Sequence, residues 1–462
     1  MNFANHKSLY LSEAGALMKI AGPLILASLV SMGISITDVV MMGWLSADAL
    51  AAGASVSDYY SVFFYLTAGV IAAISPMISQ ARGARQRYKI RSITQQGFLL
   101  AMLITIPGAI MVWNAEIILR WLGIEELIII TGQPYARMMA VTYFAMMAVN
   151  VLHYFLSAHS KTRVILIITA TALPLNAVGN YALIFGNFGM PVMGLAGAGL
   201  ASLLTAGYMV AMLLLYIANH NKFKCYHLFA RPFSHRYYHV PEIIRIGLPV
   251  GLSNLGEMGV FLFSTVTMGV FGVEVLAAHT VALRMAGVLY AFPLGMAQAA
   301  TVRVGYAVGA KDNESVFLTM KTALSLAVIA GVLFMTTTLS LNSQIVSWFL
   351  SENLVPSIAS QAVLFLMLIA FFQPFDGLAC VGAGILRGFK DTKIPMLFSM
   401  AAFWGVGFLG GWTLAFIVGI QGLGIWLGLA GAVVAYSLLV GTRLYRYVSN
   451  DQQRLKLATV HA

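Results

Sequence analysis

Charged residues are scarce in this sequence. Asp, Glu, Lys and Arg together make up 9% of its 462 residues, whereas 60% of the residues are hydrophobic. A typical soluble domain has about a quarter of its residues charged, and a helix of about 20 apolar residues spans a bilayer. The composition therefore excludes a soluble globular domain and predicts an integral membrane protein.

Cysteine and acidic residues are also few. The two cysteines, Cys225 in a basic loop and Cys380 in an apolar run, predict no disulfide framework. Sixteen acids against 27 Lys and Arg give a formal net charge of +11. In a membrane protein this excess collects in cytoplasmic loops, so we interpret it as topology and expect no nucleic-acid partner. The polar N-terminus leads directly into the first apolar run and predicts no cleavable signal peptide.

Twelve apolar segments are long enough to cross a bilayer at a rise of about 1.5 Å per residue. They predict an all-α integral membrane fold with twelve transmembrane helices. Charge and turn signals place these segments at approximately 15–42, 54–81, 95–118, 134–157, 164–186, 191–217, 243–270, 278–305, 320–345, 359–386, 394–419 and 423–446.

The connections between the segments alternate in charge. Lys and Arg are concentrated after even-numbered segments, for example in 82–91 and 222–236. The connections after odd-numbered segments carry mainly acids, such as Glu125 and Glu126. Because positively charged loops stay in the cytoplasm, this pattern places the even-numbered connections and both termini on the cytoplasmic side.

The two halves of the sequence resemble each other at an offset of 226 residues. Segments 20–56 and 246–282 are identical at twelve positions, including prolines and glycines. Because each half has six spans, both copies enter the membrane from the same side, which predicts parallel repeats related by a pseudo-two-fold axis along the membrane normal. The predicted parts are an N-terminal lobe at 1–218, a cytoplasmic linker at 219–242, and a C-terminal lobe with a short cytoplasmic tail at 243–462.

Two acids lie deep inside apolar segments of the second half. Glu257 is twelve residues after Arg245, and Asp376 is eleven residues before Arg387, so helices would place both about 16–18 Å from the cytoplasmic flank. A charge at mid-membrane costs about 2.5–3.5 kcal/mol. If the two acids face each other, their repulsion and desolvation favour the uptake of a proton or a metal cation. The alternative is an inert carboxylate that is hydrogen-bonded across helices.

The first half contains a second polar group inside apolar segments. Asp38 lies in the outer part of the first segment, and Asn176 and Asn180 are one turn apart in the fifth. An Asp with two amides predicts a hydrated ion or proton site. Amide hydrogen bonds that serve only to pack helices are the alternative interpretation.

Large side chains near the second-half acids are candidates for a substrate cavity. Phe261 and Phe372 lie one turn from the two acids. Tyr290 in the eighth segment is a further candidate, because a hydroxyl group at that depth needs a partner. Arg284 either extends outward to the interface or lines the cleft between the lobes.

Short motifs along essentially the whole chain resemble the multidrug and toxic compound extrusion (MATE) family. Glu257 and Asp376 are similar to the membrane-centre carboxylates of its NorM-like branch. The motifs are Ala277-Ala278-His279, Arg303-Val304-Gly305 with Gly309, Asp376-Gly377, Leu386-Arg387-Gly388 with Asp391-Thr392, the residues Pro23, Asp38 and Gly43, and Asn176 with Asn180.

The resemblance implies an antiporter that exports drug-like, often cationic compounds from a bacterial cytoplasm by alternating access of two lobes. It implies that Glu257 and Asp376 carry the coupling cation or proton, that Asp38 is the first-lobe acid, and that Phe261 and Tyr290 contact the substrate. We expect no cofactor beyond the coupling ion, and a functional monomer among the lipids of the inner membrane.

Two departures from the family pattern leave the coupling ion open between Na⁺ and H⁺. Phe372 stands where some sodium-coupled relatives have Tyr, which removes one oxygen ligand. Asn180 stands where the DinF-like branch has a second first-lobe Asp. Sodium needs several oxygen ligands, whereas a proton needs one suitable carboxylate.

Three other functions compete with this interpretation. A lipid-linked oligosaccharide flippase of the same superfamily needs central cations for phosphates, and Arg284 is the one candidate. A membrane-embedded enzyme is disfavoured because the sequence has neither an HExxH motif nor a convincing nucleophile and base, so we predict that the protein is not an enzyme. An ion channel is disfavoured by the repeated lobes and the isolated acids.

Overall fold

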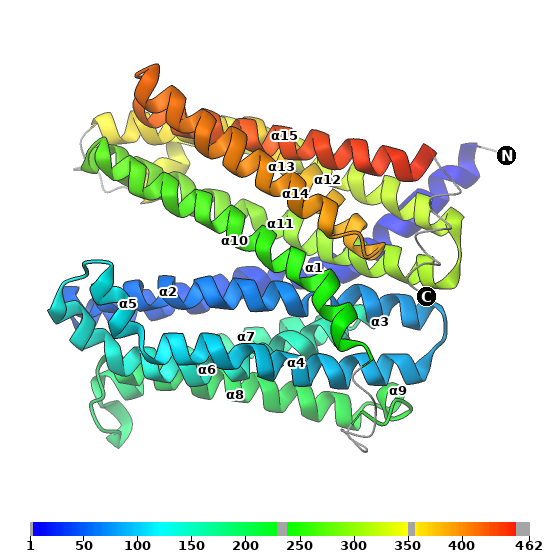
Figure 1. Ribbon diagram of the computed structural model, residues 1–462, viewed down its shortest axis with the longest axis horizontal. Helices are drawn as coiled ribbons and strands as arrows, with labels where there is room; N and C mark the ends of the chain where they lie inside the picture. The colour runs from blue at the N-terminus through cyan, green and yellow to red at the C-terminus, as the bar shows by residue number, and fades with distance from the viewer. Residues whose placement is uncertain (1–2, 229–237, 350–355, 450–462) are drawn as a thin grey trace. The chain divides into compact units, whose positions relative to one another are not determined.

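The computed structural model describes residues 3–228, 238–349 and 356–449, and these residues form helices and turns without any strand (Figure 1). Twelve helical stretches in this part of the chain are long and apolar enough to cross a membrane. Each of them coincides with one predicted segment. The all-α membrane fold with twelve spans is therefore confirmed.

Most spans correspond to single helices, but two are composite. Helices α2 and α3 together form the span Ala47–Gly83, and α14 continues through the π-helical stretches η2 and η3 to Ile417. The elements are α1 (Phe3–Leu45), α2 (Ala47–Ile71), α3 (Ile74–Gly83), α4 (Arg87–Trp113), α5 (Ala115–Trp121), α6 (Glu126–Ala158), α7 (Thr162–Phe185), η1 (Asn187–Gly189), α8 (Leu195–Asn219), α9 (Asn221–Lys224), α10 (Val240–Val270), α11 (Val273–Ala310), α12 (Asn313–Phe349), α13 (Pro356–Gly388), α14 (Lys393–Met400), η2 (Ala401–Gly410), η3 (Thr413–Ile417) and α15 (Gln421–Ser449).

The third segment ends earlier than the predicted residue 118. Helix α4 stops at Trp113, and a separate short helix, α5, begins at Ala115. The side-chain amide of Asn114 donates to the carbonyl oxygen of Ile110 at 2.8 Å. Local side-chain hydrogen bonds of this kind compete with helix propagation, which accounts for the break inside an apolar run.

Contacts divide the chain into two compact units. The N-unit is Gly22–Gly251, and the C-unit comprises Met1–Ala21 and Leu252–Ala462. The boundaries lie inside α1 and α10, which are corresponding helices of the internal repeat. The predicted lobes at 1–218 and 243–462, with their linker, stay a prediction.

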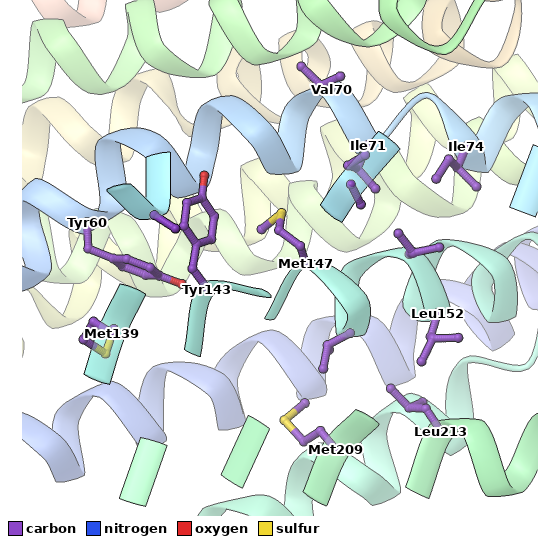
Figure 2. Close-up of a cluster of buried hydrophobic side chains, with 14 of the residues drawn as sticks. Tyr60, Val70, Ile71, Ile74, Met139, Tyr143, Met147, Leu152, Met209 and Leu213 are labelled. Carbon is purple, nitrogen blue, oxygen red and sulfur yellow. The ribbon is translucent and has the colours of Figure 1, made fainter. Parts of the chain in front are cut away.

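The core of the N-unit is built around α6, which packs against α2, α4, α7 and α8. Figure 2 shows side chains of this core, among them Tyr143, Met147 and Leu213, all with no exposed surface. The hydroxyl group of Tyr143 lies 2.6 Å from Thr67 Oγ1 and donates to the carbonyl oxygen of Phe63 at 2.7 Å. The hydroxyl group of this buried tyrosine therefore has hydrogen-bond partners, which a buried tyrosine usually needs.

The C-unit is built around α13, which packs against α11, α12 and α15. At Gly384 the two backbones of α13 and α11 approach so closely that a Cβ atom would lie 2.4 Å from the carbonyl oxygen of Ala297. Thr301 Oγ1 also donates to the carbonyl oxygen of Gly384 at 2.7 Å. Small residues that permit such approach, together with interhelical hydrogen bonds, hold membrane helices together.

A buried ion pair attaches the first part of α1 to the rest of the C-unit. Arg303 on α11 donates through Nε to Glu13 Oε1 at 2.9 Å and through Nη2 to Glu13 Oε2. Thr319 on α12 donates to Glu13 Oε1 at 2.7 Å. The Glu13 side chain is 8% exposed and that of Arg303 is 32% exposed. One carboxylate therefore joins three helices.

We expect Glu13→Gln to lower the thermal unfolding temperature of the detergent-solubilised protein. The substitution leaves the guanidinium of Arg303 without its counter-charge; breaking a fully buried pair costs about 3–5 kcal/mol, and the partial exposure of Arg303 lowers this cost. The matched control is Glu126→Gln, which removes the carboxylate of the fully exposed pair with Arg120 and should change little. Equal unfolding temperatures for the two variants would contradict the structural role of Glu13.

Candidate functional site

Glu257 lies on α10 beside two hydroxyl groups of the C-unit. Ser399 Oγ, at the end of α14, donates to Glu257 Oε1 at 3.3 Å. Ser253 Oγ, one turn earlier on α10, lies 3.3 Å from the same carboxylate oxygen and 2.8 Å from Ser399 Oγ. Three side-chain oxygen atoms from two elements are thus gathered at one point within the apolar segments.

Asp376 on α13 belongs to the same group, because its carboxyl group lies within electrostatic range of that of Glu257. Tyr290 on α11 and Cys380, one turn after Asp376, lie near both acids. The Tyr290 hydroxyl group lies 3.6 Å from Cys380 Sγ. Within the part of the chain that the structure describes, neither carboxylate forms a salt bridge.

The other predicted cavity residues differ in their placement. Phe261, on the same helix as Glu257, has its ring centroid 6.4 Å from that of Phe403 in η2. Phe372 is buried. Arg284 is exposed and makes no salt bridge among the described residues, so it is not paired with either of the two acids.

The backbone next to Ser399 departs from the α-helix. From Ala401 to Gly410 the chain is π-helical, and this stretch contains Phe403 and Trp404. π-Helical insertions are rare in proteins, but those that occur are often found at functional sites. They change the direction of the side chains around them. Here it follows directly after the serine that hydrogen-bonds Glu257.

A second polar group lies in the N-unit. Asn180 Nδ2 on α7 donates to Asp38 Oδ1 on α1 at 2.5 Å and to Asn176 Oδ1 at 3.2 Å. Ser202 on α8 lies beside the Asp38 carboxyl group. Both asparagines have no exposed surface, and Asn180 Oδ1 has no hydrogen-bond partner among the described residues. Helices α1, α7 and α8 thus place one carboxylate and several neutral oxygen atoms together.

Tyr135 on α6 extends this second group. Its hydroxyl group lies 3.2 Å from Ser57 Oγ on α2, and the residue is near Asp38. Sequence reasoning missed Ser202, Tyr135, Ser253 and Ser399, because single hydroxyl residues in apolar segments carry no pattern that separates them from packing residues.

Both groups consist mainly of carboxylate, amide and hydroxyl oxygen. Among the described residues no three His, Cys, Asp or Glu side chains gather closely enough to hold a metal ion. Oxygen donors suit hard cations, whereas soft transition metals prefer thiolate and imidazole ligands. The arrangement is chemically able to exchange a proton or to contribute oxygen ligands to a small hard cation.

Comparison with known families decides the identity of the chain. The sequence model of the family described as MatE matches residues 23–182 and 249–413, one match in each half. The chain belongs to the MatE family. The two matched regions contain Asp38, Asn176, Asn180, Glu257 and Asp376, so all five acids and amides considered above lie within the family's own domains. The protein is accordingly a transporter of this family.

Several curated relatives extend over nearly the whole chain. A protein of Mesorhizobium japonicum, named probable multidrug resistance protein NorM, is 35% identical over 445 residues, which are 95% of each chain. A relative with the same name from Synechocystis is 32% identical over 92% of this chain and 94% of its own length. Another, from Neisseria meningitidis serogroup B, is 31% identical over 92% of each chain. The chain therefore spans nearly the whole length of these relatives.

Solved structures confirm the fold. The eukaryotic MATE transporter AtDTX14 superimposes with a TM-score of 0.87 at 21% identity, over 98% of this chain and 99% of that one. A MOP superfamily transporter from Pyrococcus furiosus, described as having a binding pocket of reverse polarity, gives a TM-score of 0.83 at 19% identity, over 94% and 96% of the two chains. At these identities the likeness establishes the fold alone.

Proposed function

We propose that this MatE protein is a cation-coupled multidrug efflux antiporter. The curated relatives above carry the name multidrug resistance protein NorM, which supports drug-like substrates. The single observation that carries the coupling is the pair of acids Glu257 and Asp376, whose carboxyl groups lie within electrostatic range of each other inside membrane-spanning helices. A pair of this kind favours the uptake of positive charge.

The C-unit group is the proposed coupling site. Glu257 binds the cation or proton with the help of Ser253 and Ser399, whose hydroxyl groups lie within 3.3 Å of one carboxylate oxygen. Asp376 is the second acid of the site. Na⁺ and H⁺ both fit this chemistry: the clustered oxygen atoms suit Na⁺, and a carboxylate removed from water suits H⁺.

Asp38, Asn176 and Asn180 form a proposed second ion or proton site in the N-unit. Its support is the buried Asp38 carboxylate together with Asn180 Oδ1, a buried oxygen without a described partner. A buried acceptor without a partner costs free energy, and a bound cation or water would satisfy it.

We assign the substrate to a cavity lined by Phe261, Tyr290 and Phe372, with Arg284 as a further contact. Aromatic side chains adapt to many apolar and cationic molecules, and a ring face attracts an organic cation. The position of Phe261 and Tyr290 near the carboxylates supports competition between drug and coupling ion. A cation that binds the two conformations unequally would then drive alternating access.

The proposed location is a bacterial inner membrane, with both termini cytoplasmic and the protein acting as a monomer surrounded by lipid. The alternation of loop charge supports this orientation. A lipid-linked oligosaccharide flippase is the second candidate, because proteins with this fold differ in function, as the binding pocket of reverse polarity is described to suggest for the Pyrococcus furiosus transporter.

Transport by purified protein in liposomes tests the proposal. Vesicles are loaded with a fluorescent organic cation, and a Na⁺ gradient or a pH gradient is imposed separately. We expect one of the two gradients to drive the cation across the membrane and its removal to stop the movement. Folded protein that moves no organic cation under either gradient would contradict the antiporter and favour the flippase, which a labelled lipid-linked sugar would then test.

A further inference from the structure

A groove runs between α12 and α15 of the C-unit, with α13 at its floor. Its cavity volume is about 220 Å³. Phe317, Lys321 and Leu324 line it from α12, and Ser437, Gly441 and Tyr445 line it from α15. We call it the α12/α15 groove. None of its residues belongs to the two groups of acids and amides described above.

The spacing of the lining residues shows that the groove follows the helix axes. On α15 the three residues recur every four positions, and on α12 they recur at intervals of four and three, so each set occupies one helix face. Eight residues of α15 correspond to about 12 Å along the axis. The groove is therefore elongated, with mainly apolar walls, and has the form that an extended hydrocarbon chain requires.

Lys321 is the charged residue of this groove. It lies eight residues after the start of α12, inside the membrane-spanning stretch Asn313–Ser347. Its ammonium group is 4.7 Å from the ring centroid of Phe317, the side chain is exposed, and it forms no salt bridge among the described residues. The ninth predicted segment begins at residue 320, so Lys321 lies at the end of this span, where a lysine ammonium group reaches the lipid headgroups.

Gly441 leaves the middle of the groove open. A Cβ atom at this position would meet no atom within 4 Å, and the residue is exposed. Leucine has a higher helix propensity than glycine, so helix stability does not explain the glycine at this position of α15. The glycine thus keeps space next to Leu324 and Ser437 that a larger side chain could fill without a clash.

We propose that the α12/α15 groove binds one phospholipid with an anionic headgroup. The lipid phosphate pairs with Lys321, and one acyl chain lies along Leu324 and Gly441. Tyr445, which is 71% exposed, stands beside the headgroup, where an aromatic ring with a polar tip is favourable. Charge complementarity selects this occupant: an apolar groove alone would accept any hydrocarbon chain, whereas the unpaired cation favours a lipid with net negative charge.

Native mass spectrometry of the purified, delipidated full chain tests the assignment. The protein is titrated with phosphatidylglycerol and, separately, with phosphatidylcholine of the same acyl chains. Lys321→Ala removes the charge, Lys321→Arg retains it, and Gly441→Leu fills the groove. The matched controls are Arg137→Ala, which removes an exposed cation that lies over the ring of Trp113, and Gly207→Leu, which adds a leucine at another exposed, open glycine.

We expect the wild type to bind the first phosphatidylglycerol about tenfold more tightly than phosphatidylcholine, since a tenfold ratio corresponds to one ordinary charge pair near a membrane surface. Lys321→Ala should remove this preference, Lys321→Arg should keep it, and Gly441→Leu should weaken the binding of both lipids. The two control variants should bind like the wild type. Retention of the preference in Lys321→Ala, or equal binding by Gly441→Leu and Gly207→Leu, would overturn the proposal.

Discussion

Glu257→Gln is expected to reduce gradient-driven drug efflux by about 100-fold, the upper range of coupling between two ligands of one protein. Glutamine has nearly the shape of glutamate and can still accept from the hydroxyl groups of Ser253 and Ser399, which lie 3.3 Å from the carboxylate oxygen. It cannot take up a proton or balance the charge of Na⁺. The loss should therefore appear in transport while the protein remains folded.

The assay is efflux of the fluorescent organic cation from liposomes, with the thermal unfolding temperature measured in parallel. Asp376→Asn should show a comparable loss, and the double variant should be no worse than either single variant, because residues that act as a unit are not additive. Glu274→Gln, at the exposed start of α11, is the matched control. Wild-type efflux by both Glu257→Gln and Asp376→Asn would contradict the assignment of the coupling site.

The second large effect is expected at Asp38. Asp38→Asn should lower efflux by about tenfold or more, within the usual range of coupling free energies. The carboxylate accepts from Asn180 Nδ2 at 2.5 Å, and an amide in its place would keep the polar contact of the helices while removing the charge. Asp48→Asn, an exposed acid in the first turn of α2, is the control with the same chemical change.

The alternative interpretation, in which Asp38 and the asparagines only pack α1 against α7, predicts a different outcome. Asp38→Asn would then lower the unfolding temperature, and folded protein would transport at the wild-type rate. Efflux normalised to the amount of folded protein distinguishes the ion-site interpretation from the packing interpretation. A normal rate per folded molecule would assign Asp38 to packing.

The fold was predictable from the sequence because the bilayer imposes a simple length and polarity rule. Hydropathy together with charge and turn signals located all twelve spans, and deep acids such as Glu257 and Asp376 were visible because a charge in an apolar run is rare. The end of α4 was not predictable from hydropathy, since it depends on a single hydrogen bond of the Asn114 side chain.

Contacts between distant parts of the chain were beyond the reach of sequence reasoning. Ser399 meets Glu257 across 142 residues, and Glu13 meets Arg303 across 290 residues. None of these four residues belongs to a periodic sequence pattern that indicates its partner. A serine in an apolar helix is ordinary, and Arg303 near a helix end resembles an interfacial anchor, so only the packed structure identifies their roles.

The most direct test of the central claim measures the coupling ion itself. Liposomes containing the protein and an internal dye for pH or for Na⁺ are given a gradient of organic cation and no ion gradient. We expect one ion to move in the direction opposite to the drug. This ion movement should disappear in Glu257→Gln and persist in Glu274→Gln. Drug movement by folded wild-type protein without counter-movement of either ion would contradict cation-coupled antiport.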